Sequence, residues 1–113
     1  MNGDPGAVEL ARSEKNLRTT SISSAEFLFG ARHRGKKKIW DMSEKFISFF
    51  PVLPFDAESS VIYADIASSL SMAGKRISTM DELIAAIAIR HDEPLVTRDR
   101  HFSEIDGLEI VSY

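Results

Sequence analysis

Three acidic residues, Glu26, Asp81 and Asp99, stand where a catalytic metal site could form. Each follows a predicted strand or opens a predicted helix. Clustered carboxylates repel one another unless a cation neutralises them, and Mg²⁺ or Mn²⁺ prefers oxygen ligands and shares phosphate oxygens with a substrate. Such a site favours phosphodiester hydrolysis, because bound ions activate a water and stabilise the leaving oxygen. We therefore expect these acids to form a Mg²⁺ or Mn²⁺ site.

Each acid also has a purely structural interpretation. Glu26 lies three residues after Ser23, which is the spacing of a capping box, and Asp81 can complement a helix dipole. Asp99 can cap the short turn that follows it. Thr97, at the end of a predicted strand, either orients Asp99 or a metal-bound water, or simply satisfies backbone groups. The residues alone leave both interpretations open.

Helices alternate along the chain with short apolar strands. The predicted helices cover residues 4–15, 23–35, 39–49, 56–73 and 80–90, and the predicted strands cover residues 17–22, 52–55, 95–97 and 108–111. This alternation is typical of an α/β fold, with a short parallel sheet between two helical layers. In such a sheet the carboxyl ends of strands share one edge with the amino ends of the following helices. All three acids map to that edge.

Capping residues mark the predicted helix ends. Ser23 or Ser24 is predicted to cap the second helix, Asp56 the fourth and Thr79 the fifth. Gly74 supplies a left-handed stop for the fourth helix. The fifth helix is apolar almost all round, so it must be covered on most sides.

Composition bounds the remaining possibilities. With 113 residues, 43% of them hydrophobic, the chain can build one core, so we expect a single domain over residues 1–113. No residue is cysteine, which excludes disulfides and Cys-ligated metals. No apolar stretch could span a bilayer and no signal peptide is recognisable, so we expect a cytoplasmic protein without membrane contact. The histidines lack zinc-motif spacing; they are His33, His91 and His101.

A basic segment interrupts an otherwise acidic chain. The formal net charge is -3, which argues against a wholly electrostatic nucleic-acid binder. Five cations nevertheless lie at the end of the second predicted helix and just after it: Arg32, Arg34, Lys36, Lys37 and Lys38. They either complement the negative end of a helix or face RNA or an acidic partner.

Three segments together resemble the PIN domain, and within it the VapC-like toxin ribonucleases. They are Ile22–Ala31, Ile77–Ala86, in which an aspartate precedes Leu-Ile-Ala-Ala, and Leu95–Phe102, with its Leu-Val-Thr-x-Asp-x-x-Phe pattern. The likeness extends to Tyr63–Ile66 and to the closing segment 105–110. It therefore covers nearly the whole chain.

The resemblance implies a function for the same residues. Glu26, Asp81 and Asp99 would be the acids of a Mg²⁺ or Mn²⁺ site that cleaves RNA, inhibited by the tail of a small VapB-like antitoxin, in a homodimer. PIN domains begin with a strand that ends in an aspartate, followed by a helix, before a segment similar to Asn2–Ala7. We therefore expect the chain to be incomplete at its N-terminus, either as part of a longer gene product or as a degenerate copy.

Two other classes of function are alternatives to the ribonuclease. A catalytically inactive PIN-like module would bind an antitoxin or RNA, and binding of Mg²⁺ or Mn²⁺ near the three acids would discriminate against it. A receiver-like phosphoacceptor would also place acids at strand ends. It is disfavoured because the chain offers no acidic pair after an early strand and no lysine at the end of a late strand.

Overall fold

The computed structural model describes residues 18–112. The chain divides into two compact units, unit 1 up to Leu53 and unit 2 from Pro54. The helix predicted over residues 4–15 lies outside the described residues.

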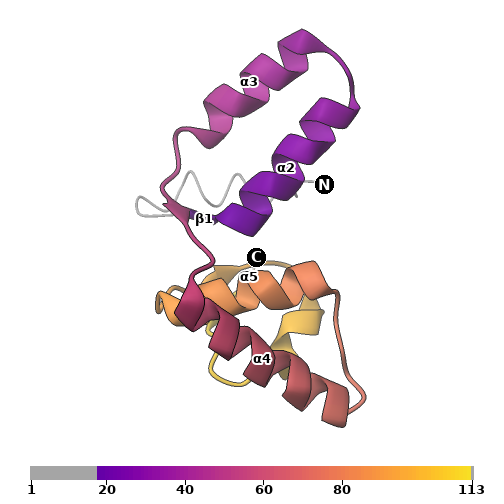
Figure 1. The fold of residues 1–113 in the computed structure, drawn as a ribbon, viewed down its shortest axis with the longest axis vertical. Helices are drawn as coiled ribbons and strands as arrows, with labels where there is room; N and C mark the ends of the chain where they lie inside the picture. Colours follow the sequence, from indigo (N-terminus) through magenta and orange to yellow (C-terminus); the bar gives the residue numbers. More distant parts are fainter. Residues whose placement is uncertain (1–17, 113) are drawn as a thin grey trace. The chain divides into compact units, whose positions relative to one another are not determined.

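Unit 1 contains a helical hairpin between two short strands (Figure 1). Its elements are β1 (Thr19–Thr20), α2 (Ser21–His33), α3 (Lys37–Ile47) and β2 (Val52–Leu53). The strands pair in parallel, with Thr19 opposite Val52. Helix α2 packs against α3 through aromatic rings, and the centroids of Phe27 and Phe46 are 5.8 Å apart.

Helix α2 begins earlier than its sequence indicates. The predicted caps Ser23 and Ser24 are wrong, because Thr20 is the N-cap and its hydroxyl accepts a hydrogen bond from the Ser23 amide at 3.0 Å. The predicted strand over residues 17–22 therefore gives way to helix at Ser21. A threonine that ends a strand can cap the next helix directly, so no separate loop is needed.

Helix α3 is also displaced toward the N-terminus. It covers Lys37–Ile47 instead of the predicted 39–49. In its first turn, Lys37 Nζ lies 2.8 Å from Asp41 Oδ2, an ion pair at the favourable four-residue spacing. After it, the Phe49 and Phe50 amides bond to the carbonyls of Phe46 and Ile47 in a tightening turn.

Unit 2 packs two helices and two strands around one core. Its elements are α4 (Ala57–Met72), α5 (Thr79–Arg90), β3 (Leu95–Val96), the 3₁₀ helix η1 (Arg100–Glu104) and β4 (Ile110–Val111). The buried members of its core are Ile66, Leu70, Ala85, Ala86, Phe102 and Ile105. Strands β3 and β4 are parallel, with Leu95 opposite Ile110. The parallel pairs in both units confirm the α/β class.

Two of the predicted helix ends in unit 2 are confirmed and one is corrected. Asp56 caps α4 by accepting from the Ser59 amide at 2.9 Å, and Gly74 follows the helix with a φ of 70°. Helix α5 is capped by Ser78, one residue before the predicted Thr79. No described helix is long and apolar enough to cross a membrane.

Candidate metal and nuclease site

Asp81 lies in the first turn of α5. The helix is capped by Ser78, whose hydroxyl accepts a hydrogen bond from the Asp81 amide at 3.1 Å. The Asp81 side chain is half-buried. The first turn of a helix carries a partial positive charge, so a carboxylate there interacts favourably with the helix.

Asp99 follows β3 and is held by a second set of local hydrogen bonds. The Asp99 amide donates to the Thr97 hydroxyl at 3.0 Å, and Asp99 Oδ1 accepts from the His101 amide at 2.9 Å. The His101 ring nitrogen Nδ1 also lies 2.9 Å from Asp99 Oδ1. Asp99 therefore caps η1, as its structural interpretation predicted, and the Thr97 hydroxyl binds a backbone amide, as its own structural interpretation predicted. A role of Thr97 in orienting the Asp99 carboxylate or a metal-bound water stays a prediction.

The elements that carry Asp81 and Asp99 pack on the same core. Helix α5 contributes Ala85 and Ala86, and η1 contributes Phe102. All three side chains are buried. Both aspartates therefore stand on parts of unit 2 that are fixed by tertiary packing.

Glu82, beside Asp81, has a role that the sequence interpretation missed. Its side chain is fully buried and both oxygens bind Arg76. The spacing could have revealed that Glu82 is buried. Three residues of the core-facing side of α5 follow it at intervals of three, four and seven: Ala85, Ala86 and Ile89. With both oxygens engaged by Arg76, Glu82 is unsuited to bind a metal.

Glu26 lies in unit 1, in the second turn of α2, and its side chain is exposed. Its capping-box interpretation is wrong, because Ser23 is inside the helix and Thr20 is the cap. The predicted acids therefore divide between the units, with Asp81 and Asp99 in unit 2. Their association into one cluster stays a prediction.

The donor chemistry of unit 2 fits a hard cation. Asp81 and Asp99 offer carboxylate oxygens, which Mg²⁺ and Mn²⁺ prefer, and Mg²⁺ commonly uses one or two carboxylates beside water and phosphate. Within either unit, the described residues contain no group of three or more Asp, Glu or His that could hold a metal. A metal site in unit 2 would therefore need substrate or water oxygens beside the two carboxylates, and the pairing of Asp81 with Asp99 stays a prediction.

The predicted basic residues surround the turn between α2 and α3. Arg32 lies in the last turn of α2, Arg34 follows it, and Lys37 and Lys38 open α3 after Lys36. The hydrogen bond and charge of Asp41 raise the pKa of Lys37. The Arg32 guanidinium lies 3.6 Å from the centroid of the Trp40 ring.

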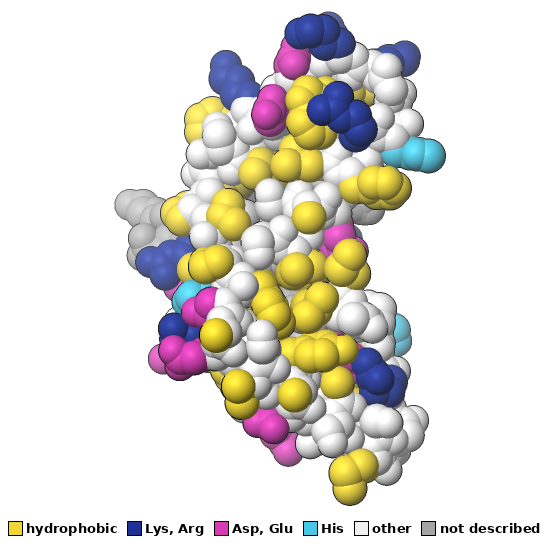
Figure 2. Space-filling view, viewed as in Figure 1, with side chains coloured by type: hydrophobic (Ala, Val, Ile, Leu, Met, Phe, Trp, Pro, Cys, Tyr) yellow, Lys and Arg dark blue, Asp and Glu magenta, His cyan; other side chains and the backbone are white. Residues whose placement is uncertain are grey.

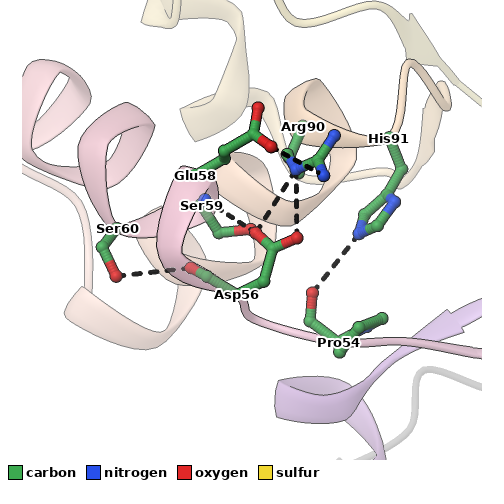
Figure 3. Close-up of polar contacts among 7 residues, drawn as sticks. All are labelled: Pro54, Asp56, Glu58, Ser59, Ser60, Arg90 and His91. Carbon is green, nitrogen blue, oxygen red and sulfur yellow. Dashed lines mark hydrogen bonds and ion pairs between the residues drawn. The ribbon is translucent and has the colours of Figure 1, made fainter.

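Asp56 belongs to a different polar cluster, which connects α4 to α5 (Figure 3). Arg90 Nε lies 3.1 Å from Asp56 Oδ2, and Arg90 Nη2 lies 3.0 Å from Glu58 Oε1. The Ser59 amide and hydroxyl, and then Arg90, lower the pKa of Asp56. Because these partners satisfy its carboxylate, Asp56 has a structural role.

The sequence matches the model of the PIN domain over residues 2–108. The chain belongs to the PIN domain family. It is 33% identical to VapC ribonuclease Y4jK of Sinorhizobium fredii over 109 residues, which cover 90% of this chain and 78% of that protein. It is 41% identical to Ribonuclease VapC1 of Rickettsia felis over 66 residues, but that alignment covers 58% of this PIN domain and only 49% of the relative.

Solved structures of the same type have a similar fold. One chain in the crystal structure of VapBC2 from Rickettsia felis, bound to a DNA fragment from their promoter, has a TM-score of 0.82 and 26% identity. The match covers 96% of this PIN domain and 83% of that chain. The resemblance to VapC-like proteins that residues 77–86 and 95–102 predicted is confirmed.

Proposed function

We propose that this PIN domain is a metal-dependent endoribonuclease of the toxin–antitoxin type. The observation that carries the proposal is the placement of Asp81 and Asp99 at the openings of α5 and η1, each fixed by a local cap. The relatives named VapC ribonucleases supply the reaction class. Glu26 is the proposed third acid.

The chain's own groups would do the positioning in this reaction. Asp81 and Asp99 would hold Mg²⁺ or Mn²⁺, and the bound ion would supply a nucleophilic water and charge stabilisation at phosphate. Thr97 would fix the direction of Asp99 through the hydrogen bond to its amide. Asp99 Oδ2 is the oxygen that neither the His101 amide nor its ring uses, so it is the oxygen proposed for the metal.

The proposed partner is a VapB-like antitoxin. The similar structures are VapBC complexes. Helix α3 and the turn after it also offer apolar surface, because Met42 in the helix and Phe49 after it are 62% and 70% exposed. A small protein encoded next to this chain should co-purify with it on co-expression. A Met42→Lys, Phe49→Lys variant should lose that partner while keeping its helical circular dichroism. We also propose a homodimer in the cytoplasm, where the RNA substrate resides, and light scattering would test the dimer.

The test of the activity is cleavage of single-stranded RNA by the purified chain in Mn²⁺, in Mg²⁺ and in EDTA. An Asp81→Asn, Asp99→Asn variant purified in the same way controls for contaminating nuclease. Cleavage that requires metal and disappears in the variant supports the proposal. Absence of cleavage by a chain that unfolds cooperatively would favour the second candidate, an inactive module that binds an antitoxin or RNA.

A further inference from the structure

Aromatic rings and cations alternate at the end of unit 1 where α2 turns into α3. On α2, Phe29 is 70% exposed and its ring stacks on His33, with centroids 5.9 Å apart and planes inclined by 27°. On the neighbouring helix, Trp40 carries the Arg32 guanidinium over its ring. Both pairs therefore involve the last turn of α2, since His33 follows Arg32 directly.

The cations around these pairs have few partners. Lys37 is neutralised by Asp41, but Arg34, Lys36 and Lys38 form no ion pair within the part of the chain that the structure describes. All three side chains are exposed. Figure 2 shows Lys and Arg side chains gathered over this end of unit 1, with hydrophobic side chains beside them. The net positive charge of the turn suits an anionic ligand that also presents flat apolar faces.

We propose that the α2–α3 turn is a binding site for single-stranded RNA, in which Phe29–His33 and Arg32–Trp40 stack against unpaired bases and the neighbouring cations hold the backbone phosphates. Every base offers a flat face, and stacking on aromatic or guanidinium planes is the usual way that unpaired bases are held. Successive nucleotides alternate base and phosphate, as rings and cations alternate here. This inference rests on the proposed function and names a site in unit 1 that would hold the substrate.

The geometry favours RNA over an acidic protein segment. An acidic helix could pair with the cations, but it would present no flat ring to Arg32, whose guanidinium already lies over the Trp40 ring. A stacked guanidinium is pre-oriented, so a base can add to its outer face without a further loss of side-chain freedom.

Trp40 provides a direct probe, because it is the chain's one tryptophan. Its fluorescence is titrated with an 8-nucleotide single-stranded RNA in EDTA, where no metal-dependent cleavage occurs. We expect saturable quenching that weakens steeply with salt, and little quenching by a duplex of the same sequence, whose bases are already stacked.

Two sets of variants separate stacking from charge. Phe29→Ala is expected to weaken binding by about 5- to 150-fold with an unchanged salt slope, because stacking releases no counterion. A Lys36→Gln, Lys38→Gln variant is expected to reduce the slope of log affinity against log salt by about 0.7 per lysine. Lys45→Gln is the matched control, since Lys45 lies in the last turn of α3, away from the α2–α3 turn, and it should leave affinity and slope nearly unchanged.

The outcomes also separate this inference from the proposed function. Quenching that is equal for duplex and single strand, or unaffected by Phe29→Ala, would overturn the stacking site even if the chain cleaves RNA with Mn²⁺. Binding of the co-purified antitoxin that is lost in the Phe29→Ala variant, while RNA binding is unchanged, would assign the turn to the protein partner. Quenching by RNA in the Asp81→Asn, Asp99→Asn variant would support the inference even where cleavage fails.

Discussion

The Arg76 guanidinium forms two parallel hydrogen bonds with the Glu82 carboxylate, at 2.8 Å from Nε to Oε2 and at 2.5 Å from Nη2 to Oε1. Glu82 is fully buried, whereas the Arg76 side chain is 43% exposed. The hydrogen bonds and charge of Glu82 raise the pKa of Arg76. This pair anchors the segment before α5 to the first turn of the helix, next to Asp81.

Loss of the arginine should destabilise unit 2. Arg76→Met leaves the buried Glu82 carboxylate without its counter-ion, which is costlier than removing both charges. We expect Tm to fall by about 5–10 °C in thermal unfolding followed by circular dichroism. An Arg76→Met, Glu82→Leu variant should recover much of that loss. Equal Tm values for the single variant and the parent would show that the pair contributes nothing.

Acid should weaken the connection between α4 and α5. Because its hydrogen bonds hold the pKa of Asp56 below the ordinary value of 3.8, its ionised form stabilises the fold above that pH. This contribution is lost as pH falls through the lowered pKa. Asp56→Asn keeps an N-cap side chain but cannot ionise. The Tm of the Asp56→Asn variant should therefore be lower than that of the parent at pH 7, and the difference between the two Tm values should shrink between about pH 4 and pH 2.

Glu58→Gln is the matched control for this pH dependence. Glu58 also contacts Arg90, but its side chain is 73% exposed, and exposed pairs contribute little. Its Tm should follow that of the parent at every pH. A pH dependence of Asp56→Asn that is parallel to the parent's would refute the role given to Asp56.

Thr97 should affect activity more than stability. Thr97→Val removes the hydroxyl that accepts from the Asp99 amide at 3.0 Å, so Asp99 loses one of the contacts that orient it. We expect kcat for RNA cleavage to fall about 10-fold, with a change in unfolding free energy near 1 kcal/mol. Thr97→Ser keeps the acceptor and should restore the rate. If valine and serine variants cleave equally well, the hydroxyl does not position Asp99.

The sequence patterns predicted which helices and strands form more accurately than they predicted where each one begins and ends. Asp56 and Gly74 mark the ends of α4 as predicted, because each has a single strong local role. The starts of α2 and α5 were misplaced because serine and threonine occur in runs there, and several hydroxyls compete for the same cap. Only the backbone geometry decides that Thr20 and Ser78 are the caps.

The candidate site was predictable in its residues but not in its contacts. Asp81 and Asp99 were predicted from their places in the first turn of a helix and after a strand. The bond from His101 to Asp99 and the burial of Glu82 depend on η1 and on the core face of α5. These are tertiary features, which the hydrophobic periodicity of strands and helices does not predict. The association of Glu26 with the two aspartates remains a prediction.

The most direct test of the nuclease is the initial rate of RNA cleavage in Mn²⁺ by the parent, by Asp99→Asn and by Glu104→Gln. Glu104, an acid in η1, serves as the control for Asp99, and its Oε1 lies 3.2 Å from Lys75 Nζ in a surface ion pair. We expect Asp99→Asn to lower the rate at least about 100-fold, while Glu104→Gln cleaves like the parent and all three unfold at similar temperatures. Equal rates for Asp99→Asn and the parent would contradict the assignment of Asp99 to the catalytic site.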